Sequence, residues 1–147
     1  MSTLIVESSR FGTLEIEAGA IIEFPTGLIG LGSRRWAVVG ADPESAFQWL
    51  HSVDDPSLAL PVTSPWAFFP EYEISLSDED GDRIDAQRPE DIAVWVTVRA
   101  GSELADFSAN LRAPIIVAKG EGHQVINEWP QAEVRAPLFP DAHAAAA

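Results

Sequence analysis

His51, Ser52 and Asp54 have the residue types of a hydrolytic triad, which combines a base, a nucleophile and a carboxylate. Asp55 adds a second carboxylate directly after them. Adjacent side chains of an extended chain point to opposite faces, so this spacing does not bring the groups together. The chain also lacks a Gly-x-Ser-x-Gly elbow. We therefore interpret the segment as a polar loop after a strand, and we expect the protein not to be an enzyme.

Two further segments have the composition of ligand-binding loops. Residues 78–82 carry four carboxylates, but a calcium loop needs glycine at its sixth position, where Arg83 stands, and flanking helices. The glycines of 27–32 are spaced G-x-x-G-x-G, which is neither a dinucleotide fingerprint nor a phosphate loop. The three histidines lack ligand spacing and cysteine is absent, which argues against zinc. We predict a solvated hairpin tip at 78–82, with calcium as its alternative, a structural turn at 27–32, and no metal or cofactor.

The charge of the chain is strongly acidic. It has 23 Asp and Glu against 9 Lys and Arg, a formal net charge of −14. Such a surface repels phosphate backbones and anionic membranes and attracts basic proteins. Residues 71–91 alone hold nine acidic residues against Arg83 and Arg88. This segment is either a solubilising rim or a patch that steers a basic partner, and we expect no direct nucleic-acid or membrane binding.

The length and the ends of the chain indicate one domain. A chain of 147 residues with 46% hydrophobic residues is sufficient for a single core. It has no apolar run of about 18 residues and no basic segment at its start, so we expect a cytoplasmic protein. We place the domain at 1–140 and a disordered Ala-rich tail at 141–147, and we expect the protein to be a monomer on its own.

Period-two alternation dominates the hydrophobic pattern and predicts strands. At 13–17 and 71–76 apolar residues alternate with acids, and at 94–98 valines occupy every second position. Glycines and prolines separate the segments, which favours an all-β, mostly antiparallel barrel-like fold with at most one or two short helical turns, the first at 42–44. The remaining strands are expected at 21–24, 36–39, 47–50, 58–62, 115–118 and 124–126.

Aromatic residues suggest two kinds of binding site. Trp66 stands in a turn-rich, aromatic segment beside the acidic stretch, where it is either an exposed anchor for a protein partner or a plug over a barrel end. Five tryptophans in a β protein also suit a barrel mouth that binds a carbohydrate or another small ligand. This second function is the alternative to protein binding.

Several sequence blocks, in the same order, resemble the flagellar assembly factor FliW family. The likeness extends over about 10–138, and its most specific parts are the Phe-Pro-x-Gly-Leu block at 24–28 and the Asn-Leu-x-Ala-Pro-Ile block at 110–115. The other blocks are Arg-Phe-Gly at 10–12, Leu-His-Ser at 50–52, Pro-Glu-Tyr at 70–72 and Gly-His-Gln-Val-Ile at 122–126.

The resemblance implies a cytoplasmic barrel-like protein with two mutually exclusive partners. One is flagellin, and the other is the basic dimeric RNA-binding repressor CsrA. Members of the family hold CsrA off flagellin messenger RNA through an allosteric contact, and new flagellin competes for the factor in a chaperone-like partner switch. An acidic protein is complementary to an RNA-binding repressor and itself rejects RNA.

The same resemblance implies a set of partner-binding residues. They combine a charged and aromatic patch, two nearby acids, and two residues that organise a neighbouring loop. In that order they are Glu71, Tyr72 and Glu73, Asp54 and Asp55, and Asn110 and Pro114.

Overall fold

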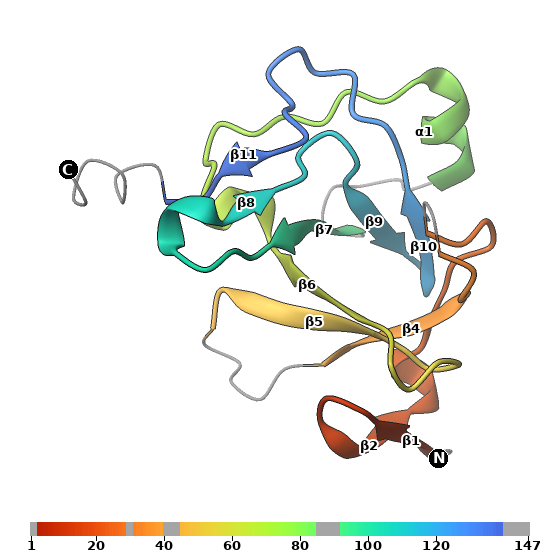
Figure 1. Cartoon of the computed structure of the whole chain (residues 1–147). Helices are drawn as coiled ribbons and strands as arrows, with labels where there is room; N and C mark the ends of the chain where they lie inside the picture. The colour runs from red at the N-terminus through yellow and green to blue at the C-terminus, as the bar shows by residue number, and fades with distance from the viewer. Residues whose placement is uncertain (1–2, 29–30, 40–44, 85–91, 140–147) are drawn as a thin grey trace.

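The computed structural model describes residues 3–28, 31–39, 45–84 and 92–139, and most of its regular elements are strands (Figure 1). The predicted all-β class is therefore confirmed. The strands are β1 (Thr3–Ser8), β2 (Gly12–Glu17), β3 (Ile22–Glu23), β4 (Arg35–Val39), β5 (Phe47–Ser52), β6 (Ala59–Thr63), β7 (Ile92–Arg99), β8 (Ser108–Ala109), β9 (Ile115–Ala118), β10 (Glu121–Gln124) and β11 (Ala136–Pro137).

The long strand β7 closes the sheet into a ring because three partners share its length. Residues 92–95 pair with β9, residues 96–97 with β6, and residues 98–99 with β8, all antiparallel. The ring therefore runs β7-β6-β5-β4-β3-β10-β9 and back to β7, while β8 and β11 extend from the end of β7. Among the described pairings, β10 with β3 is parallel and the others are antiparallel.

The interior of the ring is a dry apolar core. Phe24, Trp36, Leu50 and Ile115 are at most 1% exposed and pack on one another. In β7 the predicted alternation is present, since the valines at 94, 96 and 98 are buried and the residues between them are more exposed. Strand β7 thus covers the core with every second side chain, which is the pattern from which it was predicted.

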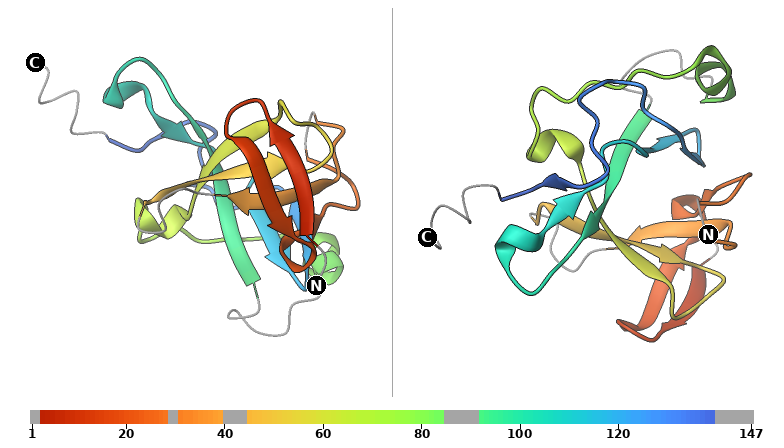
Figure 2. Two further views of the ribbon diagram at one scale, coloured as in Figure 1. Left: turned by 90° about the horizontal axis from the view of Figure 1, so that it is seen from below. Right: turned by 45° about the horizontal axis from the view of Figure 1, so that its top comes forward.

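The β1–β2 hairpin forms a separate two-stranded sheet that packs beneath β4 and β5 (Figure 2). Its buried residues Val6 and Ile16 contact Ala37 and Val53 of the barrel. The acids Glu15 and Glu17 remain exposed on the other face, as the alternation at 13–17 predicts. The hairpin therefore covers one side of the ring without pairing with its strands.

The predicted strand at 71–76 is wrong. The segment has no strand pairing, although its side chains alternate between the core at 72, 74 and 76 and solvent at 71, 73 and 75. Its backbone bonds instead to Asn127, whose Oδ1 accepts from the Ser75 amide and whose Nδ2 donates to the Glu73 carbonyl. The Asn127 side chain and the Glu128 amide, which donates to the Ser75 carbonyl at 2.7 Å, thus take the place of a neighbouring strand.

The predicted hairpin tip at 78–82 is also wrong, because this segment starts helix α1 (Asp78–Ile84). The Ser77 hydroxyl accepts a hydrogen bond from the Asp80 amide, which caps the first turn. Three acids in that turn suit the positive end of the helix dipole, and Arg83 in the last turn pairs with Asp80 at 3.4 Å. Buried Ile84 anchors the helix to the barrel core formed with Val94 and Ile116.

The other predicted elements divide into two groups. The strands at 21–24, 36–39, 47–50, 58–62 and 115–118 correspond to β3, β4, β5, β6 and β9, whereas the last predicted strand is displaced to β10, Glu121–Gln124. The helical turn at 42–44 and the tail at 141–147 lie outside the described residues. The described helical turns besides α1 are the 3-10 turns η1 (Ala18–Ala20), η2 (Pro65–Ala67) and η4 (Leu104–Asp106).

Candidate functional site

An open pocket of about 610 Å³ lies beside the barrel, between the chain that follows η2 and the chain that enters β11. Both chains cross the top of Figure 1, in yellow-green and blue. We call the pocket between them the aromatic pocket. Its apolar wall consists of Phe68, Phe69, Tyr72, Leu111, Trp129 and Ala136, and its polar residues are Glu71, Gln131 and Glu133.

Tyr72 holds the base of the aromatic pocket in place. Its side chain is 4% exposed, and its hydroxyl donates to the Leu111 carbonyl at 2.7 Å. Its ring meets Trp129 edge to face, with the centroids 5.6 Å apart. Burial raises the pKa of Tyr72, and the hydrogen bond from Asn127 opposes that rise only in part. The ring is therefore a neutral, fixed wall of the pocket.

Asn127 organises the chain that carries Tyr72. Its side chain is 1% exposed and makes four hydrogen bonds. Oδ1 accepts from the amides of Ser75 and Trp129, while Nδ2 donates to the Tyr72 hydroxyl and the Glu73 carbonyl. An amide has two donors and two acceptor positions, so this set uses its full capacity. Asn127 thereby fixes both chains that form the pocket.

The rim of the aromatic pocket is acidic and exposed. Glu71 and Glu133 both line it and face solvent. Trp66 lies close by, since its indole N–H donates to the Tyr72 carbonyl at 3.0 Å and its ring meets the Tyr72 ring edge to face. The indole is 43% exposed, so Trp66 packs on Tyr72 and still presents an accessible face.

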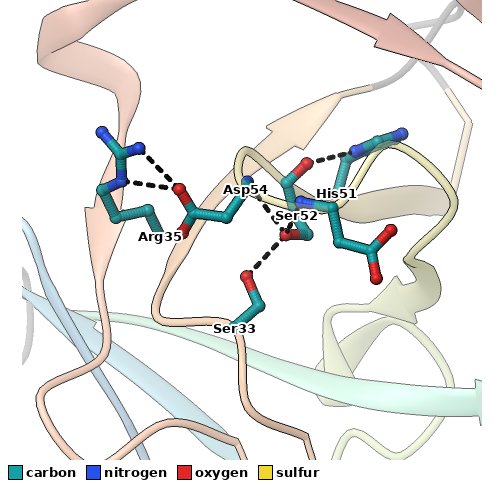
Figure 3. Close-up of polar contacts among 6 residues, drawn as sticks. Ser33, Arg35, His51, Ser52 and Asp54 are labelled. Atoms are coloured by element: carbon teal, nitrogen blue, oxygen red, sulfur yellow. Dashed lines mark hydrogen bonds and ion pairs between the residues drawn. The ribbon is translucent and has the colours of Figure 1, made fainter.

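His51 lies in a buried polar cluster rather than in a loop (Figure 3). Its ring is 0% exposed, and Nδ1 lies 2.6 Å from the Ser52 carbonyl, so this nitrogen carries the proton. Nε2 then accepts from the Ser8 hydroxyl at 2.7 Å. The Ser8 oxygen in turn accepts the amides of Arg10 and Phe11. His51 therefore ties the β1–β2 turn to β5, which corrects the predicted polar loop.

Asp54 and Asp55 follow β5 at the surface. Asp54 accepts from the Arg35 guanidinium, an ion pair that raises the pKa of Arg35 (Figure 3). Asp55 accepts from the amide and hydroxyl of Ser57, and these bonds lower the pKa of Asp55. Asp54 is thus paired with a residue of β4 and Asp55 is engaged within its own turn, and neither lines the aromatic pocket.

The structure separates the predicted partner-binding residues into groups. Glu71 and Tyr72 line the aromatic pocket, and Glu73 is exposed next to them. Asn110 turns the chain after β8, because its Oδ1 accepts the amides of Arg112 and Ala113. Buried Pro114 follows in the same turn. Several residues that line or support the pocket are absent from the predicted set, namely Phe68, Phe69, Pro70, Leu111, Asn127, Trp129, Gln131, Glu133, Ala136 and Pro137.

The described residues thus form an all-β protein in which a ring of strands carries an open aromatic pocket with an acidic rim. The family model for the FliW protein matches residues 5–138, and the chain belongs to the FliW family. In the described residues no helix is long and apolar enough to cross a membrane. The same part of the chain contains no group of three or more His, Cys, Asp or Glu placed to hold a metal ion.

Individual relatives resemble the chain over most of its length. The flagellar assembly factor FliW of Desulfitobacterium hafniense (strain DSM 10664 / DCB-2) is 34% identical over 142 residues, which cover 95% of this chain and 93% of that protein. The factor of Clostridium botulinum (strain Alaska E43 / Type E3) is 35% identical over 126 residues, which cover 84% of this chain and 89% of that protein.

A crystal structure of the flagellar assembly factor FliW has the same fold. It matches 92% of this chain and 97% of its own chain with a TM-score of 0.84 and 29% identity. The barrel described above is therefore the fold of this family.

Proposed function

We propose that this protein is a flagellar assembly factor that acts in the cytoplasm by binding two protein partners in turn, flagellin and a CsrA-type repressor. By binding the repressor it relieves the repression of flagellin messenger RNA, and flagellin releases the repressor by taking its place. The protein works as a binding partner and has no enzymatic activity of its own. The proposal rests on membership of the FliW family together with one geometric observation.

That observation is the apolar pocket with acidic edges. Phe68, Phe69 and Trp129 offer aromatic surface for an apolar side chain, and Glu71 and Glu133 lie at the edge where basic groups of the same partner reach. Aromatic pockets surrounded by polar groups concentrate binding energy in protein interfaces. The net charge of −14 additionally attracts a basic repressor over long range.

Titration of the purified protein with a CsrA-type dimer and with flagellin tests the proposal. We expect micromolar or tighter binding of each, competition between them, and weaker repressor binding as salt screens the acidic surface. Absence of binding to both partners at micromolar concentration would show that the proposal is wrong.

A pair of charge reversals locates the surface. Glu71→Lys with Glu73→Lys should weaken repressor binding at least about tenfold, because both carboxylates are exposed beside the aromatic pocket. The matched control is Glu15→Lys with Glu17→Lys, two exposed acids with the same spacing on β2. Equal affinities of the two double variants would move the interface away from the pocket.

Binding of a small ligand is the second candidate, and the same pocket favours it. A volume of about 610 Å³ with four aromatic rings is within the usual range for small-molecule sites, and sugars stack on such rings. The pocket lies beside the barrel rather than in its mouth. Saturable binding of mono- or oligosaccharides, detected by quenching of tryptophan fluorescence and lost in Trp129→Ala, would favour this function over protein binding.

A further inference from the structure

The short sheet β11–β8–β7 has a polar outer face opposite its apolar inner face. Val98, Ala109 and Ala136 form successive pairs across the three strands, and all three are buried in the core beside the aromatic pocket. Because strand side chains alternate, the neighbouring residues of these strands point outward. The outward residues are Thr97, Arg99, Ser108, Asn110 and Arg135, and we call them the arginine face.

The arginine face is hollowed and holds two guanidinium groups without ion pairs. A pocket of about 240 Å³ is lined by all five of its residues. In the part of the chain that the structure describes, Arg35 and Arg83 are salt-bridged, whereas Arg99 and Arg135 have no salt bridge. Among the described residues Arg10, Arg34 and Arg112 also have no salt bridge, so the distinguishing feature of Arg99 and Arg135 is that they line the same pocket.

The other side chains of the arginine face add hydrogen-bond donors. The Asn110 Oδ1 accepts the amides of Arg112 and Ala113, which sets the orientation of the amide and leaves Nδ2 as a donor. Thr97 and Ser108 contribute hydroxyls to the same pocket. Guanidinium groups with additional donors form the chemistry that recognises an oxyanion.

We propose that the arginine face binds a carboxylate side chain of a protein partner. The pocket of about 240 Å³ has room for one acidic side chain, and the net charge of −14 disfavours a nucleic acid or another polyanion. The arginine face also shares its chain segments with the aromatic pocket, since Leu111 and Glu133 line one pocket while Asn110 and Arg135 line the other. The two pockets lie on opposite faces of this short sheet, so a partner contacts both by extending around the edge strand β11, and this step rests on the proposed function.

A small probe tests the site without any protein partner. The ¹⁵N-labelled protein is titrated with N-acetylglutamate N-methylamide, with the neutral glutamine analogue, and with inorganic phosphate. We expect millimolar, saturable shifts of the amide signals of Thr97, Ser108 and Arg135 with the glutamate probe only. Arg99→Gln and Arg135→Gln should each weaken the binding about three- to tenfold, and Arg34→Gln, at an exposed arginine outside this pocket, should leave it unchanged.

Three results of this titration would overturn the proposal. Equal shifts with the glutamine analogue would show that charge is not recognised, and equal binding by the arginine variants would place the contact elsewhere. Saturation by phosphate without response to the glutamate probe would assign the site to a different anion.

A separate affinity measurement tests whether the arginine face contributes to partner binding. Arg99→Gln should weaken the binding of flagellin or of the repressor about three- to tenfold, while Arg34→Gln leaves both unchanged. Unchanged affinity of Arg99→Gln for both partners would overturn the assignment to a partner carboxylate. If neither partner binds the unmodified protein, the proposed function fails, and the small-probe titration still reports on the site by itself.

Discussion

The Tyr72 hydroxyl lies between two groups far away in sequence, accepting from Asn127 Nδ2 at 3.0 Å and donating to the Leu111 carbonyl at 2.7 Å. All three residues are at least 95% buried. A buried hydroxyl with one donor and one acceptor partner is satisfied, whereas removal of either partner leaves a polar group without water or protein to bond to. The hydrogen bond between Tyr72 and Asn127 therefore determines how firmly the wall of the aromatic pocket is held.

A double-mutant cycle measures the coupling between Tyr72 and Asn127. Asn127→Ala should lower the free energy of unfolding by about 2 to 4 kcal/mol, because it removes four hydrogen bonds from the buried chain. Tyr72→Phe should cost about 1 to 2 kcal/mol. The double variant should be more stable than the sum of the two losses predicts, by about 0.5 to 1.5 kcal/mol, in urea unfolding. Strict additivity would mean that the two side chains are not coupled.

The single tyrosine makes its titration directly observable. Tyr72 is the only tyrosine of the sequence, so tyrosinate absorbance near 295 nm reports this residue alone. Burial raises its pKa, which means that the folded protein favours the neutral phenol. The absorbance midpoint should therefore lie higher in the folded protein than in the urea-unfolded protein.

The same shift makes stability depend on pH with a defined sign. A pKa that is raised on folding contributes stability below the unfolded value of about 10, and this contribution is lost as pH rises further. Thermal unfolding between pH 8 and 11 should show a steeper loss for the unmodified protein than for Tyr72→Phe. Parallel curves would contradict a raised pKa, and Lys119 and the arginines, present in both proteins, cancel in the comparison.

The segment at 71–84 shows what local pattern could and could not reveal. The alternation at 71–76 correctly indicates which side chains face the core, but a strand also needs a pairing strand, and here the partners are the Asn127 side chain and the Glu128 amide. The helix at α1 had a readable signal, Ser77 followed by acids in the first turn, which the glycine at 81 obscured. The Asp-Gly pair at 80–81 predicts a turn, whereas the Ser77 cap favours the helix that forms.

The ring and the aromatic pocket depend on contacts distant in sequence. Strand β7 was predicted from its valines, yet its division among β9, β6 and β8 is set by tertiary packing and leaves no local pattern. Glu71 and Tyr72 were selected through a family motif, whereas Trp129 and Glu133 reach the same pocket from the chain before β11. Only the three-dimensional fold brings those two chains together.

The buried His51 cluster predicts a graded response to substitution. His51→Ala should cost about 2 to 4 kcal/mol, because it leaves a cavity and removes the partners of Ser8 and the Ser52 carbonyl. His51→Gln should cost clearly less, since an amide offers one donor and one acceptor at similar positions. Chemical denaturation of both variants checks the order. Equal losses would show that packing, rather than the two hydrogen bonds, determines the stability of the cluster.

The surface pair of Arg35 with Asp54 should contribute little to stability. Both side chains are more than a third exposed, and exposed ion pairs are typically worth less than about 1 kcal/mol. Asp54→Asn should therefore fold normally, with a midpoint of urea unfolding close to that of the unmodified protein. This makes it a clean test of the predicted role of Asp54 in partner binding, since a loss of affinity in this variant cannot be ascribed to unfolding. A large loss of stability would instead show that the ion pair organises the turn after β5.

Two glycines should respond in opposite directions to replacement by alanine. Gly81 lies inside α1, and a Cβ built there meets no atom within 4 Å, so Gly81→Ala should raise the free energy of unfolding by about 0.5 to 1 kcal/mol. Gly27 has φ +72°, and a Cβ there would lie 3.1 Å from the Leu31 carbonyl oxygen. Gly27→Ala should therefore lower the free energy of unfolding by about 1 to 3 kcal/mol. Urea unfolding of the two variants side by side measures both effects, and a destabilised Gly81→Ala would show that the start of α1 needs the freedom of glycine.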